Sequence, residues 1–253
     1  MDSDEYPASY FESIGDLCDQ ILNITKKWEV VWYRGLPSSD FKLIPSIFRG
    51  KRVHEHFNSI EFRRRARLID GALSSQFDFM CLMQHHGLPT RLLDWTESLS
   101  VALYFSSCGP YQKGYSPTIW LLGPFQLGKL NGISDVICTS TDDDIIKHCD
   151  IAFNDFSNLE NNSYKKYPVP VLPDFMSRRL AAQEGVFTIH GTDKRPVEDT
   201  VPKSMRRYLR KLVAKNGCEG ALRKQIRLVM PNGNSMFPDI DGIGKYLADH
   251  GAE

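Results

Sequence analysis

Apolar residues recur every three or four positions in several stretches of the chain, which is the spacing of one buried helix face. These stretches predict helices over residues 11–27, 52–75, 77–86, 142–149 and 202–215, and another that begins after Ser98. A short helix or turn is expected over residues 175–183. The helix over 77–86 should end at Gly87, because glycine suits a left-handed cap and Pro89 cannot continue a helix.

Shorter runs of β-branched and aromatic residues, bounded by Gly and Pro, predict strands. They lie at residues 30–33, 90–95, 118–122, 186–189 and 222–230. Residues 128–173 are more polar and rich in turn formers, so they predict a long excursion between elements. No internal repeat and no clear linker divides the sequence, so we expect a single domain over residues 1–253 that opens with an N-terminal helix within residues 1–27.

Two predicted strand ends carry side chains suited to an anionic ligand. Arg34 ends a strand just before Gly35, where a guanidinium can hold a phosphate through two hydrogen bonds. Asp94, Trp95 and Thr96 end another strand and precede a helix N-terminus, a common place for the anionic part of a ligand. The alternatives are structural: an arginine that ties a carboxylate or carbonyl, an Asp94 that pairs with Arg91 to brace a turn, and a Trp95 that belongs to the core.

Charge and composition narrow the function classes only a little. The 31 basic and 31 acidic residues balance, so no overall field favours nucleic acid or membrane. Two local arginine clusters lie at residues 61–67 and 206–211. Each is either a solvated helix face or a surface that contacts nucleic acid. The polar N-terminus and the lack of an apolar run of about 18 residues predict a cytoplasmic protein without a membrane span. The six cysteines are scattered, which favours neither disulfides nor a zinc site.

Several blocks of the sequence closely resemble those of the FRG-domain family, which is named for a Phe-Arg-Gly motif. The naming motif is Trp-Tyr-Arg-Gly here, with Tyr33 in place of Phe, and the longest block is QHHGLPTRLLDWT followed by ALYFS. The resemblance spans roughly residues 28–247. Its blocks lie at residues 32–35, 43–49, 84–96, 179–188 and 236–242.

The family order also resembles, at a distance, the fold of ADP-ribosyltransferases. The resemblance implies an α+β fold with a mixed, split β-sheet flanked by helices. In that fold a first strand carries an arginine that holds NAD, a second ends in a hydroxyl-bearing motif before a helix, and a later one supplies a glutamate. Arg34, the pair Trp95-Thr96 before Ser98, and the pair Gln183-Glu184 occur in that order.

The same resemblance assigns roles to these residues. Cleavage of the bond between nicotinamide and ribose passes through an oxocarbenium-like ribose, which a nearby carboxylate stabilises. Glu184 is the candidate carboxylate; Gln183 is an alternative functional residue and Asp94 an alternative carboxylate. Ligand-binding candidates are Arg34 for a diphosphate oxygen, Thr96 and His86 for ribose or amide, and Tyr33 or Trp95 for stacking on nicotinamide.

We therefore expect an NAD-dependent ADP-ribosyltransferase with NAD as substrate and no metal. It is expected to act as a bacterial or phage-conflict toxin, with RNA favoured over DNA or protein as acceptor, and with a possible antitoxin partner. The alternative is a non-catalytic module that binds a nucleotide or nucleic acid. A metal hydrolase built on His54-Glu55-His56 and His85-His86 lacks the usual HExxH spacing, and a serine hydrolase lacks GxSxG.

Overall fold

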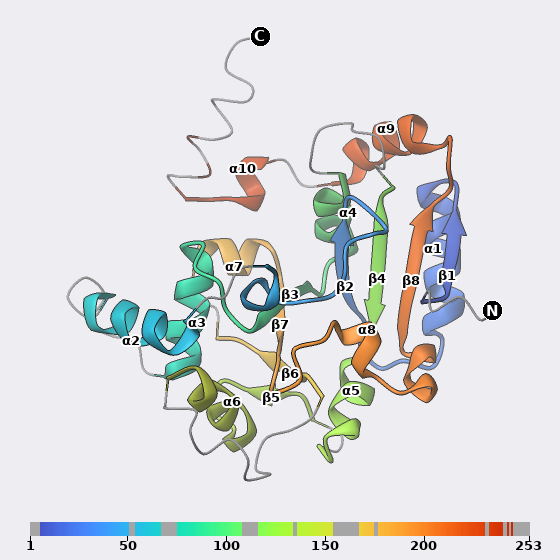
Figure 1. The fold of residues 1–253 in the computed structure, drawn as a ribbon. Helices are drawn as coiled ribbons and strands as arrows, with labels where there is room; N and C mark the ends of the chain where they lie inside the picture. Colours follow the sequence, from blue (N-terminus) through green and yellow to red (C-terminus); the bar gives the residue numbers. More distant parts are fainter. Residues whose placement is uncertain are drawn as a thin grey trace.

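The structure, a computed structural model, describes residues 6–50, 54–66, 75–107, 116–133, 136–153, 167–174, 177–230 and 233–239, together with Gly242 and Gly244. Within these residues the strands form one mixed sheet in the order β1-β8-β4-β2-β3-β7-β6-β5 (Figure 1). The strands are β1 (Ala8–Phe11), β2 (Trp32–Leu36), β3 (Leu92–Thr96), β4 (Thr118–Leu122), β5 (Cys138–Thr139), β6 (Val169–Leu172), β7 (Gly185–Ile189) and β8 (Leu209–Ala214).

Helices flank both halves of this sheet. They are α1 (Ile14–Thr25), α2 (Glu55–Ala66), α3 (Gln76–His85), α4 (Leu99–Ser107), α5 (Pro124–Leu130), α6 (Asp143–Phe153), α7 (Arg178–Ala182), α8 (Val197–Thr200), α9 (Glu219–Val229) and α10 (Gly233–Met236), with 3₁₀ turns at Ser46–Phe48 and Lys203–Arg207. The predicted α+β fold with a mixed sheet flanked by helices is confirmed. None of the described helices is long and apolar enough to cross a membrane.

Three apolar clusters hold the layers together. Helices α1, α4 and α9 pack on β1, β4 and β8, with residues such as Leu17, Leu103 and Ile226 buried between them. Helices α3 and α6 pack on β3, β6 and β7 at the other half, on the left in Figure 1. The third cluster covers the middle of the sheet and contains Trp32 and Trp95.

The two halves of the sheet meet at a sparse junction between β2 and β3. Five residue pairs join β2 to β4 and five join β3 to β7, whereas only Tyr33 and Thr96 are in register between β2 and β3. The two strands therefore part beyond this pair. Arg34 and Asp94 lie where they separate, so the sheet itself creates a gap beside both residues.

Helix α4 approaches β2 unusually closely at Gly35. A Cβ atom added there would lie 1.7 Å from the backbone oxygen of Ala102. The N-terminal end of α4 is fixed by Thr96, whose hydroxyl accepts a hydrogen bond from the Ser98 amide at 3.0 Å. The end of β3 and the start of α4 are thus held together beside the junction.

Most of the predicted elements are present with shifted ends. The helix predicted over 77–86 is α3, which opens with a capping box between Ser75 and Asp78 and is followed by Gly87 at φ 78°. Strands β2, β3, β4 and β7 match predicted strands, and α6 lies inside the predicted excursion. That excursion also contains β5 and β6, which the sequence reasoning missed.

Two predictions near the C-terminus are wrong. Residues 202–215, predicted as a basic helix, form a 3₁₀ turn and strand β8, because Leu209 and Leu212 are buried on opposite faces of the sheet. The strand predicted over 222–230 is helix α9, in which Leu222 and Ile226 share the buried face. The family-like block at residues 236–242 is described only in part, because residues 240 and 241 lie outside the described residues.

Candidate functional site

A cavity of about 420 Å³ opens at the junction of β2 and β3. Cavities of about 360 and 240 Å³ adjoin it, and Gln84 and Asp94 line all three. The largest of the three draws its walls from β2, β3, α4, α7 and β7. Its polar and aromatic lining residues are Tyr33, Arg34, Gln84, Asp94, Trp95, Thr96, Phe105, Arg179, Gln183 and Phe187.

Arg34 crosses the gap between the two strands. Its Nη1 donates to the backbone oxygen of Asp94 and lies 3.5 Å from the Asp94 Oδ2. No residue of β2 is in register with Asp94, so this backbone oxygen has no partner in that strand. The Arg34 side chain is 14 % exposed, and burial lowers the pKa of its guanidinium while the Asp94 carboxylate opposes the shift. Its buried Nε has no hydrogen-bond partner among the described residues.

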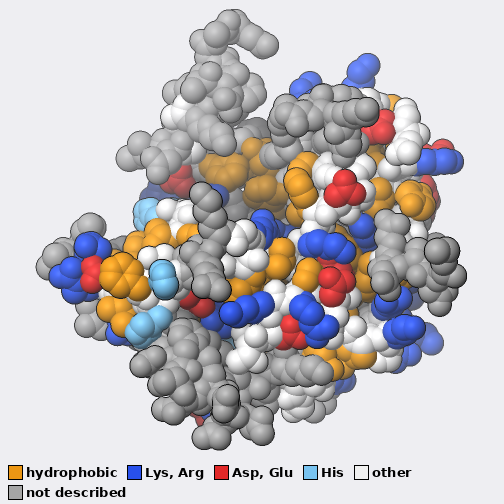
Figure 2. All heavy atoms as spheres, in the orientation of Figure 1, with side chains coloured by type: hydrophobic (Ala, Val, Ile, Leu, Met, Phe, Trp, Pro, Cys, Tyr) orange, Lys and Arg blue, Asp and Glu red, His pale blue; other side chains and the backbone are white. Residues whose placement is uncertain are grey.

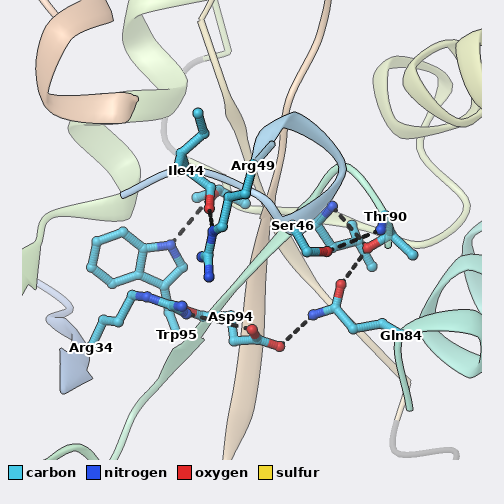
Figure 3. Close-up of polar contacts among 10 residues, drawn as sticks. Arg34, Ile44, Ser46, Arg49, Gln84, Thr90, Asp94 and Trp95 are labelled. Carbon is cyan, nitrogen blue, oxygen red and sulfur yellow. Dashed lines mark hydrogen bonds and ion pairs between the residues drawn. The ribbon is translucent and has the colours of Figure 1, made fainter. Parts of the chain in front are cut away.

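Asp94 is held from the opposite side by α3. The Gln84 side-chain amide donates to the Asp94 Oδ1 at 2.5 Å, and the Gln84 carbonyl accepts from the Thr90 hydroxyl (Figure 3). The Asp94 side chain nevertheless stays 59 % exposed. It therefore offers an oriented carboxylate to the cavities on both sides of it.

Thr96 and Gln183 link β3 to the turn before β7. The Thr96 hydroxyl donates to the Gln183 backbone oxygen at 2.7 Å, and the Gln183 side-chain amide donates to the Met236 oxygen at 3.0 Å. Both residues line the 420 Å³ cavity. Their polar groups are engaged within the protein, so the structure gives them a positioning role at the cavity wall.

Trp95 belongs to the core rather than to an exposed platform. Its side chain points to the face of the sheet opposite Asp94, it is 3 % exposed, and its indole N–H donates to the Thr188 hydroxyl at 3.2 Å. Tyr33, by contrast, lines the cavity and is half-buried, and burial raises the pKa of its hydroxyl. Tyr33 is thus the more accessible of the two predicted stacking residues.

Glu184 and His86 lie away from the 420 Å³ cavity. Glu184 is exposed in a left-handed turn at φ 43°, and its side chain lines none of the described cavities. His86 ends α3, where it lines the 360 Å³ cavity and lies 6.5 Å from Phe62 between ring centroids. Among the described residues that line the 420 Å³ cavity, the acidic side chain is Asp94.

Sequence reasoning missed three residues that line these cavities. Gln84, Arg49 and Arg179 all fall inside the family-like blocks. Their place in these blocks was the one feature of the sequence that could have marked them as site residues. Their roles depend on how α3, the Ser46–Phe48 turn and α7 converge on β3. Such convergence is a property of the tertiary fold, which residue spacing does not encode.

Arg91 does not brace Asp94, so that alternative is wrong. Arg91 pairs with Glu55 through its Nε at 2.8 Å, and its Nη1 donates to the backbone oxygens of His190 and Gly191 at 2.9 Å. Glu55, the central residue of His54-Glu55-His56, is therefore committed to a buried ion pair. No group of three or more His, Cys, Asp or Glu side chains with metal-binding geometry occurs in the described part of the chain.

The two predicted arginine clusters differ in the structure. On α2, Arg64 and Arg65 are exposed and pair with Glu61, and Arg63 lies over the Phe153 ring at 5.2 Å. The residues of the second cluster do not share one helix face; they point to Tyr6, Tyr208, Ser9 and Ser39. On the face in Figure 2, basic side chains lie interspersed with acidic and apolar ones.

The comparisons with known proteins bear on the N-terminal part of this site. No curated protein and no solved structure matches the chain. Residues 29–114 match the family model described as FRG domain. The matched range includes Arg34, Arg49, Gln84 and Asp94 but not Gln183. The chain therefore carries an FRG domain over these residues, in agreement with the blocks at residues 32–35, 43–49 and 84–96.

Proposed function

We propose that the chain is an NAD-dependent ADP-ribosyltransferase and that NAD binds in the cavity at the junction of β2 and β3. The observation that carries this proposal is the adjacency of β2, β3 and β7 in the sheet. These strands carry or follow the three blocks expected to form the NAD site. Residues of all three blocks, Arg34, Asp94 and Gln183, line one cavity.

In this proposal the ligand lies across the gap in the sheet. Arg34 binds a phosphate oxygen, since the hydrogen bonds of its guanidinium to the described residues all come from Nη1. Tyr33 and Phe105 provide aromatic surface for the nicotinamide ring. The cavity of about 420 Å³, with its two neighbours, is in the usual size range for a small-molecule site.

Asp94 replaces Glu184 as the carboxylate of the mechanism. The bond between nicotinamide and the ribose C1′ breaks, and its electron pair leaves with neutral nicotinamide. The Asp94 carboxylate stabilises the positive charge that develops on the ribose. A nucleophilic oxygen or nitrogen of the acceptor then bonds to C1′ and loses its proton, which Asp94 can take.

The acceptor is proposed to be nucleic acid, with RNA favoured, and protein as the second class. The support comes from α2, where the exposed guanidinium groups of Arg64 and Arg65 can meet phosphates. A role as a toxin in bacterial or phage conflict, controlled by an antitoxin, belongs to this proposal.

A binding module is the second candidate, and one observation favours it. Asp94 already accepts from Gln84 and Arg34, and Glu184 lies outside the cavities. A carboxylate committed in this way orients Arg34 toward a ligand without taking part in bond cleavage. In that case the same cavity would bind a nucleotide and leave it intact.

The test is incubation of labelled NAD and cell extract with the wild-type chain, Asp94→Asn and Glu184→Gln. We expect labelling by the wild type, a loss of roughly 100- to 1000-fold with Asp94→Asn, and little change with Glu184→Gln. Separate RNase and protease digestion of the labelled product identifies the acceptor class.

Two results would redirect the proposal. No label and no nicotinamide release from folded wild-type protein that still binds NAD would favour the binding module. Loss of activity with Glu184→Gln but not with Asp94→Asn would return the catalytic role to Glu184.

A further inference from the structure

We propose that Arg49 joins Arg34 to form a two-guanidinium site for a phosphate or diphosphate group, in the cavity of about 240 Å³ beside Asp94. This inference deepens the proposed function, because it names the part of the ligand that this cavity takes. Both arginines line the cavity together with Ser46, Gln84 and Asp94.

Arg49 is fixed by a turn that is tied to the strand region before β3. The Ser46 hydroxyl accepts from the Thr90 amide at 3.2 Å, and the Ile47 amide donates to the Thr90 oxygen at 3.2 Å. The Arg49 Nε then donates to the Ile44 backbone oxygen at 2.7 Å. One edge of the Arg49 guanidinium is thereby anchored while its terminal nitrogens remain available to a ligand.

Among the described residues, the two guanidinium groups have one carboxylate partner between them, Asp94. In the described part of the chain, Arg49 makes no ion pair and Arg34 is paired only with Asp94 at 3.5 Å. In Figure 3 both arginine side chains extend toward the same space beside Asp94. Two neighbouring cations repel each other when partly desolvated, so a bound anion would relieve a repulsion that the single Asp94 carboxylate offsets only in part.

The volumes of the 240 Å³ and 420 Å³ cavities indicate which end of the ligand each one binds. At about 240 Å³ it is smaller than a typical site for a whole drug-sized ligand, but it shares Arg34, Gln84 and Asp94 with the 420 Å³ cavity. A phosphate between the arginines therefore leaves the ring-bearing end to the larger cavity, against Tyr33 and Phe105. Arginine suits this position because its planar fork matches phosphate oxygens.

The test is calorimetric titration of the wild-type chain and of Arg49→Gln with three probes: ADP, ADP-ribose and nicotinamide riboside. The first two carry a diphosphate and the third carries none. We expect Arg49→Gln to weaken binding of ADP and ADP-ribose by about 10- to 100-fold, the usual effect of losing a charge-assisted hydrogen bond. Binding of nicotinamide riboside should be unchanged. Arg227→Gln, which changes an exposed arginine on α9, is the matched control, and thermal unfolding verifies that each variant is folded.

The outcomes separate this inference from the proposed function. Wild-type protein that binds ADP through Arg49 but never releases nicotinamide from NAD would support the anion site and refute the transferase. Protein that cleaves NAD equally well with and without Arg49, with unchanged affinity for ADP, would refute the anion site alone. Failure of the wild type to bind either diphosphate probe would also refute it.

Discussion

Two arginine–carboxylate pairs flank the same strand and differ in how completely they are satisfied. In the pair of Arg91 and Glu55 the side chains are 3 % and 10 % exposed, and the guanidinium also binds two backbone oxygens. In the pair of Arg34 and Asp94 they are 14 % and 59 % exposed, and the side chains approach only to 3.5 Å. The first pair is closed and structural, while the second leaves donors and an acceptor for a ligand.

Arg34 and Arg91 are chemically alike, and their hydrogen bonding distinguishes the binding residue from the structural one. Both arginines stand beside β3, and both lie in family-like blocks. What separates them is the gap between β2 and β3, which supplies Arg34 with one carbonyl and an open cavity. A buried arginine whose hydrogen bonds are all made serves the fold, and one with bonds unmade is available for binding.

The largest expected effect is on the closed pair. Arg91→Met leaves the Glu55 carboxylate buried without its partner, so the free energy of unfolding should fall by about 3–5 kcal/mol. Urea unfolding followed by circular dichroism measures the change. Adding Glu55→Gln to Arg91→Met should recover part of the loss. A decrease below about 1 kcal/mol would mean that the pair is no more structural than an exposed one.

The open pair should show the reverse pattern, with function affected more than stability. Arg34→Met is expected to weaken NAD binding by about 10- to 100-fold and to lower the free energy of unfolding by no more than about 1 kcal/mol. Binding measured beside urea unfolding for the same variant tests both statements. Equal stability losses for Arg34→Met and Arg91→Met would erase the contrast between the two pairs.

The stability of the region around Arg91 and His190 should depend on pH. Burial lowers the pKa of His190 to about 3, and the Arg91 guanidinium adds to this effect. Between pH 6.5 and about 3 the unfolded chain takes up a proton that the folded chain refuses. Stability should therefore fall as pH is lowered through this window, by up to about 1.4 kcal/mol per pH unit. His190→Asn should flatten the dependence measured by thermal unfolding; an unchanged slope would assign it to other groups.

The smallest expected effect concerns the turn that holds Glu184. A non-glycine residue at φ 43° is disfavoured, so Glu184→Gly should raise the free energy of unfolding by roughly 1 kcal/mol. NAD cleavage should persist, because the side chain lines none of the described cavities. Denaturation midpoints and nicotinamide release test both points, and a stabilised but inactive variant would show that Glu184 is required for function.

Local patterns predicted the elements around the site well and the C-terminal third poorly. Helix α3 and its end at Gly87 follow from helical spacing and from the glycine. Strand β8 was hidden because it is buried on both faces and carries Lys211, whose ammonium reaches the Ser39 oxygen. A doubly buried strand loses its alternation, and its leucines can then fall at helical spacing.

The site was only partly predictable for a related reason. Arg34 and Asp94 are marked by strand ends that the sequence displays. The exclusion of Glu184 depends on the conformation of one turn, and the inclusion of Arg49 on contacts between its turn and Thr90. Both are tertiary outcomes, and neither follows from residue order.

The close approach at Gly35 gives the last residue of the Phe-Arg-Gly motif a steric meaning. With the Ala102 oxygen 1.7 Å from where a Cβ would stand, even alanine cannot be accommodated without moving the backbone of α4. In a library of all twenty amino acids at this position, only glycine should survive selection for folded protein. Mutational tolerance at residue 35 is thus set by the neighbouring helix, and the arginine beside it keeps its place because this glycine has no side chain.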